Sequence, residues 1–181
     1  MSTSHHLKPV SPVLLSLPLD VSVPNNELPV VLYPKVSGDR DLETVFRTAF
    51  HSHSWRGIWA DGVFGYHHFH SNAHEVMGVL EGEATLMLGG EEGRVIDLCP
   101  GDVLVLPAGT GHRRMRASPG FQVLGAYPKG QETYDVYTPA LDLANARARI
   151  RAVPLPREDP VYGPGGPLTR AWGQVHAVSS P

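Results

Sequence analysis

Histidines are concentrated in one short stretch of the chain. Four of the ten histidines fall between residues 67 and 74, and a glutamate follows directly, in the run HHFHSNAHE. Imidazole nitrogens and carboxylate oxygens are common ligands of transition metals. The stretch therefore carries the residue types of a metal site, provided that the backbone turns enough of them to one side.

Strand geometry selects among these histidines. Alternate side chains of a β-strand share a face, so His68 and His70 point one way together with Tyr66, and His67 points the other way. The turn at Ser71-Asn72 then brings the next strand alongside, and Glu75 opens it. The following residues on the face of Glu75 are Met77 and Val79, which predicts an interior row.

A third imidazole is supplied from further along the chain. The run PAGTGH at 107–112 is a tight loop that delivers His112 to the start of another strand, because its two glycines permit a sharp reversal and its proline stiffens the entry. Three imidazoles and one carboxylate favour one divalent transition metal such as Fe, Mn, Ni, Co, Cu or Zn and disfavour Mg or Ca.

The elements that must position these residues are short strands. From residue 57 to 127 the chain consists of β-rich runs separated by Gly/Pro turns, which is typical of a sandwich or barrel of antiparallel strands. The runs lie at 65–70, 75–80, 84–88, 94–98, 103–106, 112–116 and 121–127. An amphipathic helix is predicted over 41–51 and a second one within 140–153, and both should flank the barrel.

At this point the sequence resembles the cupin family. The first cupin motif reads G-x5-H-x-H-x3–4-E-x6-G, and Gly62, His68, His70, Glu75 and Gly82 match it. The family resemblance implies a mainly β fold, an antiparallel double-stranded β-helix (jelly-roll or cupin barrel), with a metal held inside.

The second cupin motif reads G-x5-P-x-G-x2-H-x3-N. Gly101, Pro107, Gly109 and His112 match it, whereas Arg116 stands at the position of the final asparagine. More narrowly, the runs HHFHSNAHEVMGVLEG, LPAGTGH and GAYP look like the uncharacterised cupins of the YjlB type. The resemblance covers roughly residues 57–127.

The resemblance implies that the metal ligands are His68, His70, Glu75 and His112. His74 adjoins Glu75 and is the alternative ligand; Glu75 is preferred because its distance to Gly82 fits the motif. The competing interpretation of the cluster is a cupin that keeps its histidines without binding metal. A second His-x-His at 51–53 lies at a helix end, where the two rings face different ways.

Four residues are candidates for a substrate pocket beside the metal. Arg114 and Arg116 face inward with His112 if their strand stays regular, and a guanidinium there would select an anionic ligand. The alternative is that a bulge or strand end leaves both arginines in solvent. Tyr66 and Met77 are candidate lining residues.

Length and composition favour a single domain over residues 1–181. We expect an N-terminal arm and helix at 1–56, the motif-bearing barrel at 57–127, and a C-terminal helix and tail at 128–181. The formal charge of −3 gives no reason to expect nucleic-acid or membrane partners. No signal peptide or membrane span is recognised, so a cytoplasmic location is expected. The family resemblance implies a homodimer.

Two functions of different classes are compatible with these residues. The first is a metal-dependent enzyme of the dioxygenase, isomerase or decarboxylase type, acting on a small, anionic organic molecule. The second is a non-catalytic small-molecule-binding or sensor protein that uses the metal as an anchor. A DNA-binding regulator is disfavoured because the helices are isolated and the flanks are not basic.

Overall fold

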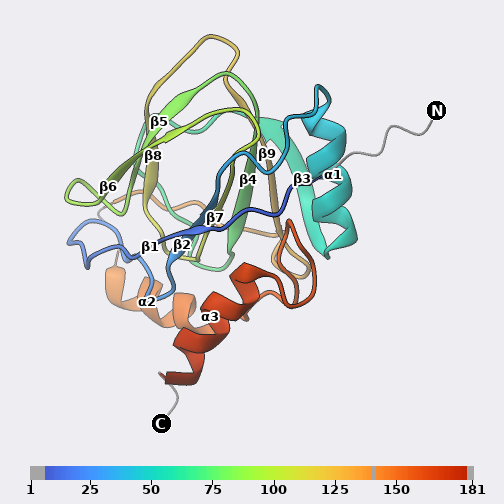
Figure 1. Cartoon of the computed structure of the whole chain (residues 1–181). Coiled ribbons are helices and arrows are strands. Elements are labelled where there is room, and N and C mark those ends of the chain that lie inside the picture. Colours follow the sequence, from blue (N-terminus) through green and yellow to red (C-terminus); the bar gives the residue numbers. More distant parts are fainter. Residues whose placement is uncertain (1–6, 140–141, 179–181) are drawn as a thin grey trace.

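The computed structural model describes residues 7–139 and 142–178. These residues form nine strands in two antiparallel sheets, together with three helices (Figure 1). The mainly β architecture expected from the sequence is confirmed. The elements are β1 (Val13–Leu15), β2 (Val30–Tyr33), α1 (Leu42–Ser52), β3 (Trp55–Asp61), β4 (Glu75–Glu81), β5 (Ala84–Leu88), β6 (Arg94–Leu98), β7 (Val103–Leu106), β8 (His112–Ala117), β9 (Gln122–Pro128), α2 (Leu143–Ala152) and α3 (Pro167–Val178).

The two sheets enclose an apolar interior. One sheet has six strands in the order β1-β2-β7-β4-β9-β3, and the other has three in the order β6-β5-β8. Met77 and Val79 of β4 pack against Leu86 and Leu88 of β5 in one buried cluster. The interior row that strand alternation predicts after Glu75 is therefore present, and it extends the barrel core up to the glutamate.

Helix α1 covers the outer face of the six-stranded sheet. Its side-chain stripe includes Phe46 and Phe50, which join the outward-facing Val76 of β4 in a second buried cluster. Gly78 of β4 allows the close approach, because a Cβ atom at this position would lie 2.4 Å from the Phe46 ring. Asp41 caps the helix by accepting a hydrogen bond from the Thr44 N–H at 3.0 Å.

The C-terminal part of the chain is ordered against the barrel in its described residues. Helix α3 buries Leu168 and Trp172 in the same cluster as α1, and Trp172 donates a hydrogen bond to the Pro29 carbonyl at 2.8 Å. Helix α2 packs Ala146 and Ile150 on a third, smaller cluster. In Figure 1 these two helices lie together at one end of the molecule, below β1 and β2.

Three local predictions differ from the structure. Strand β3 was not expected, because Gly57 has a φ of +64° and the register shifts between Arg56 and Trp59, which interrupts the alternation. The expected strand at 65–70 forms only isolated bridges. Helix α3 was not expected either, because the segment that leads into it is rich in Gly and Pro.

In the part of the chain that the structure describes, no helix has the length and apolarity that crossing a membrane requires.

Candidate metal centre

His68 and His112 lie directly opposite each other across an isolated antiparallel bridge. The backbone N–H of each donates to the carbonyl of the other, at 3.1 and 3.0 Å. Their rings come within 4.0 Å, centroid to centroid. The bridge thus brings the end of the 62–70 segment beside β8 and joins two histidines that are 44 positions apart in the sequence.

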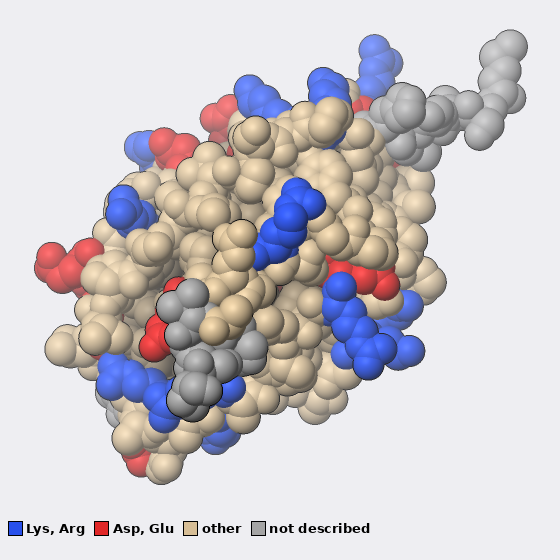
Figure 2. Space-filling model, turned by 60° about the horizontal axis from the view of Figure 1, so that its bottom comes forward, with Lys and Arg blue, Asp and Glu red and all other residues tan. Residues whose placement is uncertain are grey.

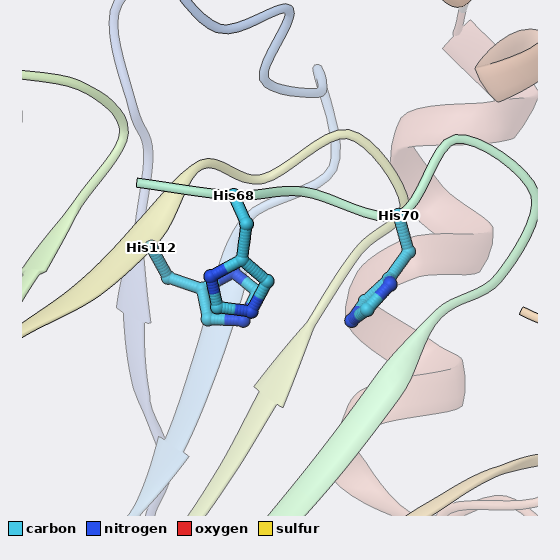
Figure 3. A group of neighbouring side chains, drawn as sticks. All are labelled: His68, His70 and His112. Atoms are coloured by element: carbon cyan, nitrogen blue, oxygen red, sulfur yellow. The ribbon is translucent and has the colours of Figure 1, made fainter. Parts of the chain in front are cut away.

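His70 completes a group of three buried imidazoles. The nitrogen atoms that His68, His70 and His112 can offer as ligands all lie within 4.8 Å of one another. Figure 3 shows the three rings projecting to the same side of their backbone, two from the segment before β4 and one from β8. Such a group can hold a transition metal ion.

The hydrogen bonds of the three rings orient the same nitrogen of each toward the centre. The Nδ1 atom of His68 faces the Tyr66 carbonyl at 3.3 Å, that of His112 faces the Thr110 carbonyl at 2.9 Å, and that of His70 faces the Asp135 carbonyl. A carbonyl only accepts, so each Nδ1 must carry the hydrogen. The Nε2 lone pairs then remain for a metal, which is the usual arrangement of histidine ligands.

Glu75 lies beside this group from β4. Its Oε2 atom is 3.5 Å from the Nε2 atoms of both His70 and His112, yet it is buried without a hydrogen-bond partner among the described residues. The other carboxylate oxygen, Oε1, accepts from the Tyr127 hydroxyl at 3.2 Å. An orphaned anionic oxygen next to three Nε2 atoms fits a cation, because a buried unpaired charge is otherwise costly.

The electrostatics of His68 and Glu75 favour the protonation states that bind a metal, whereas those of His70 favour its protonated form. Burial and the neighbouring His112 lower the pKa of His68 to about 3, so this imidazole is neutral near pH 7. Burial alone would raise the pKa of Glu75, but His70 and His112 outweigh it and hold the pKa below its ordinary value. Burial lowers the pKa of His70, and the charge of Glu75 reverses this into a net rise.

His74 points to the other side of β4, toward α3. Its Nδ1 atom accepts a hydrogen bond from the Ala108 N–H at 2.9 Å, and its ring lies 4.8 Å from that of Trp172, centroid to centroid. It is not among the three imidazoles that converge. The same alternation that turns Glu75 inward turns His74 outward, so the structure gives no support to His74 as the alternative ligand.

The other histidines of interest lie apart from the cluster. His67 is buried beside the β5–β6 turn, where its Nδ1 is 3.3 Å from a carboxylate oxygen of Glu91. His53 faces the Pro160 carbonyl at 2.9 Å, and His51 is exposed at the end of α1. Neither of the last two belongs to the group that could hold a metal among the described residues.

The candidate pocket residues lie in three different environments. Met77 is buried in the barrel interior, two positions after Glu75. Tyr66 is 51% exposed, and its ring stacks on Phe64 at a centroid distance of 5.0 Å. Phe64 in turn meets the His68 ring edge-on, also at 5.0 Å. The two aromatic rings form a partly exposed rim beside the histidines.

The two arginines do not share a face, because β8 is irregular. Arg114 pairs with Leu86, which points into the barrel, and its guanidinium lies at the surface beside Gly62. The register then shifts, and Arg116 pairs with Thr85 on the opposite face, where it donates to the Thr85 hydroxyl at 2.8 Å. The inward orientation expected for Arg116 required a regular strand and does not hold.

Several residues near the cluster had no signal in the sequence. Asp135 accepts hydrogen bonds from the Ser71 N–H and hydroxyl at 2.6 and 2.5 Å and so anchors the turn after His70. Tyr134 lies 5.1 Å from the His70 ring, centroid to centroid, and stacks on Tyr127. Trp59 donates to the Tyr127 hydroxyl at 2.9 Å. They come from a strand and a loop outside both motifs, which is why motif spacing could not find them.

Comparisons with known proteins agree with this geometry. Residues 55–118 match a family model described as a cupin domain. The chain is 40% identical over 157 residues to the uncharacterised protein YjlB of Bacillus subtilis (strain 168), covering 86% of this chain and 93% of the relative.

Solved structures with a similar arrangement are more distant. A conserved protein of Klebsiella pneumoniae with a double-stranded β-helix domain is 17% identical, with a TM-score of 0.37, over 76% of this chain and 88% of its own. The oxalate decarboxylase of Lactobacillus farciminis is 19% identical, with a TM-score of 0.34, over 45% of this chain and 25% of its own. Taken with the barrel and the motif residues, the match to YjlB shows that the chain belongs to the cupin family, as a cupin of the YjlB type.

Proposed function

We propose that this protein is a metal-dependent enzyme that acts on a small organic molecule. One divalent transition metal ion, Fe, Mn, Ni or Zn, would be held by His68, His70, Glu75 and His112. The observation that carries the proposal is the common orientation of the three imidazoles: each Nδ1 is committed to a backbone carbonyl. The three Nε2 atoms and the orphaned oxygen of Glu75 are left for one ion.

A bound ion of this kind would supply Lewis-acid or redox chemistry, as a dioxygenase, isomerase or decarboxylase requires. The protein would supply a dry site, since all four proposed ligands are buried. The Tyr127 hydroxyl would hold the Glu75 carboxylate in position, and Trp59 in turn would hold Tyr127. A fixed second layer of hydrogen bonds of this type raises the metal affinity of the ligands it orients.

The surroundings of the cluster support a small substrate with an apolar and an anionic part. Phe64, Tyr66 and Tyr134 present partly exposed aromatic surface next to His68 and His70. Arg114 reaches the surface near Gly62 from the inward face of β8 and would attract a carboxylate at the entrance. Met77 would contribute to the apolar wall behind the metal.

The first experiment separates a metal enzyme from a metal-anchored binding protein. The purified protein is stripped of metal and reconstituted anaerobically with Fe(II), Mn(II), Ni(II) or Zn(II). Oxygen uptake, and product formation by mass spectrometry, are then followed with a panel of small carboxylic acids and diketones. Turnover with one metal, lost in His112→Ala, supports the enzyme. Thermal stabilisation by a panel compound without turnover under any metal would instead support the non-catalytic sensor.

We further propose that the protein is a cytoplasmic homodimer. Strand β1 lies at the edge of the six-stranded sheet, and its Val13 and Leu14 are about half exposed, at 45% and 49%. An edge strand with exposed apolar side chains can pair with a second copy. Light scattering at micromolar concentration should give twice the mass of one chain, and a monomer mass would contradict the dimer.

A further inference from the structure

A cavity lies outside the barrel, between the N-terminal arm, α2 and α3. Its volume is about 860 Å³. The arm contributes Leu17 and Leu28 to its walls, α2 contributes Arg147 and Ile150, and His74 lines it from the side of the barrel. We call this cavity the arm pocket. None of the proposed metal ligands lines it, so it is separate from the candidate metal centre.

Two buried polar atoms of the arm pocket have no hydrogen-bond partner among the described residues. One is Nε2 of His74, whose side chain is almost fully buried, at 1% exposure. Its Nδ1 accepts from the Ala108 N–H, so the hydrogen of the neutral ring must sit on Nε2. This N–H faces the Pro154 carbonyl, which also accepts from the Gln131 amide at 2.9 Å, without reaching hydrogen-bond geometry. The second unpartnered atom is Nε of Arg147.

Both unpartnered atoms are hydrogen-bond donors, which need an acceptor. The positive charge around them favours an acceptor that is an anion. Helix α2 carries Arg147, Arg149 and Arg151 and has no acidic residue in its first turn. Arg147 and Arg151 line the arm pocket, one partly buried and one exposed. Glu27 of the arm also lines the pocket. The lining therefore carries two positive side chains and one negative side chain. The view in Figure 2, which brings the helical end of the molecule forward, shows Lys and Arg side chains with fewer Asp and Glu side chains on a largely uncharged surface.

We propose that the arm pocket binds a carboxylic acid with an apolar chain or ring. The carboxylate would accept hydrogen bonds from Arg147 and Arg151, because a guanidinium pairs with a carboxylate through two parallel N–H donors. The apolar part would lie against Leu17, Leu28 and Ile150. A volume of this size accommodates a small-molecule ligand, for which cavities of about 300–1,000 Å³ are usual.

Decanoate is a suitable probe, and binding of decanoate to the full-length purified protein is measured by titration calorimetry. We expect saturable binding that weakens by roughly tenfold or more in Arg147→Gln and in Arg151→Gln. Because Arg151 is exposed, its substitution tests the charge without disturbing folding. Decanamide, which has the same chain without the charge, should bind at least about tenfold more weakly than decanoate.

Arg149→Gln is the matched control on the same helix. Its guanidinium lies over the Tyr137 ring, 4.9 Å from the centroid, and does not line the arm pocket. Its decanoate affinity should equal that of the original protein. The proposal is overturned if no saturable binding occurs, if Arg149→Gln loses as much affinity as Arg151→Gln, or if decanamide binds as tightly as decanoate. Coordination of decanoate to a metal in the barrel would not respond to the α2 substitutions, so failure here leaves the metal proposal intact.

Discussion

Two histidine environments lie on opposite sides of the start of β4, one beside Glu75 and the other around His74. On the inner face, His68, His70 and His112 direct Nδ1 to carbonyls and leave Nε2 free. On the outer face, His74 uses Nδ1 as an acceptor for a backbone N–H and keeps its hydrogen on Nε2. Both environments are buried, yet only the first can offer neutral Nε2 lone pairs to a metal.

The comparison teaches that burial and residue type do not distinguish a ligand histidine from a packing histidine. What distinguishes them is whether the backbone presents a carbonyl or an N–H to Nδ1, because that choice sets the tautomer. The pKa of His74 is lowered to about 3 by burial, just as that of His68 is. The two rings are equally neutral and differ in where the hydrogen sits.

The two histidine environments should differ most in their effect on metal content when one histidine of each is substituted. His112→Ala removes one of the three Nε2 donors, and loss of a direct ligand should weaken metal binding by more than about 100-fold, beyond the usual cost of losing an outer hydrogen bond. The metal content of the purified protein, measured by elemental analysis, should fall from about one transition metal ion per chain to a small fraction of that. His74→Gln should retain the full content, and equal loss in both variants would contradict the assignment.

On the outer face the expected effect is on stability. His74→Ala removes the hydrogen bond to Ala108 and leaves a cavity beside Trp172. The free energy of unfolding should drop by about 2–4 kcal/mol. Urea denaturation of the metal-free protein measures this. His74→Gln, which keeps an acceptor for Ala108, should lose less, and an unchanged unfolding midpoint in His74→Ala would show that the ring packs loosely.

The contribution of the Glu75 carboxylate beside the three histidines is measured by changing this residue alone. Glu75→Gln keeps the size of the side chain but removes its charge, so the metal dissociation constant should rise by about tenfold or more. Competition with a chromophoric chelator gives the value. An unchanged constant would mean that the ion is held by the three histidines without Glu75, which would remove the carboxylate from the ligand set.

The smallest effect is expected at the residue that holds Glu75. Tyr127→Phe removes the hydroxyl that donates to Oε1 and accepts from Trp59. Metal affinity should fall by only about two- to tenfold, at or below the usual range for an outer hydrogen-bond partner. The same chelator competition detects it. A loss as large as that of Glu75→Gln would indicate that Tyr127 itself contacts the ion or its ligand.

Most strands of the barrel could be predicted from the sequence because the patterns that specify them are local. The runs at 84–88, 94–98 and 103–106 coincide with β5, β6 and β7, since alternation and Gly/Pro turns act within a few residues. The preference for Glu75 over His74 also rests on a local feature, the distance from Glu75 to Gly82 in the first cupin motif. By contrast, β3 and α3 contain irregularities or Gly-rich flanks that weaken any local pattern, and long-range packing of Trp55 and Trp172 stabilises them.

The sequence by itself determined which residues are candidates for a metal centre, because the two cupin motifs supply them at matching spacings. Only the tertiary structure decided their chemical state. The carbonyl facing His70 belongs to Asp135, which is 65 positions away, and the bulge that turns Arg116 outward depends on the pairing of β8 with β5. Tautomers and strand register are set by partners distant in the chain, and no local pattern encodes them.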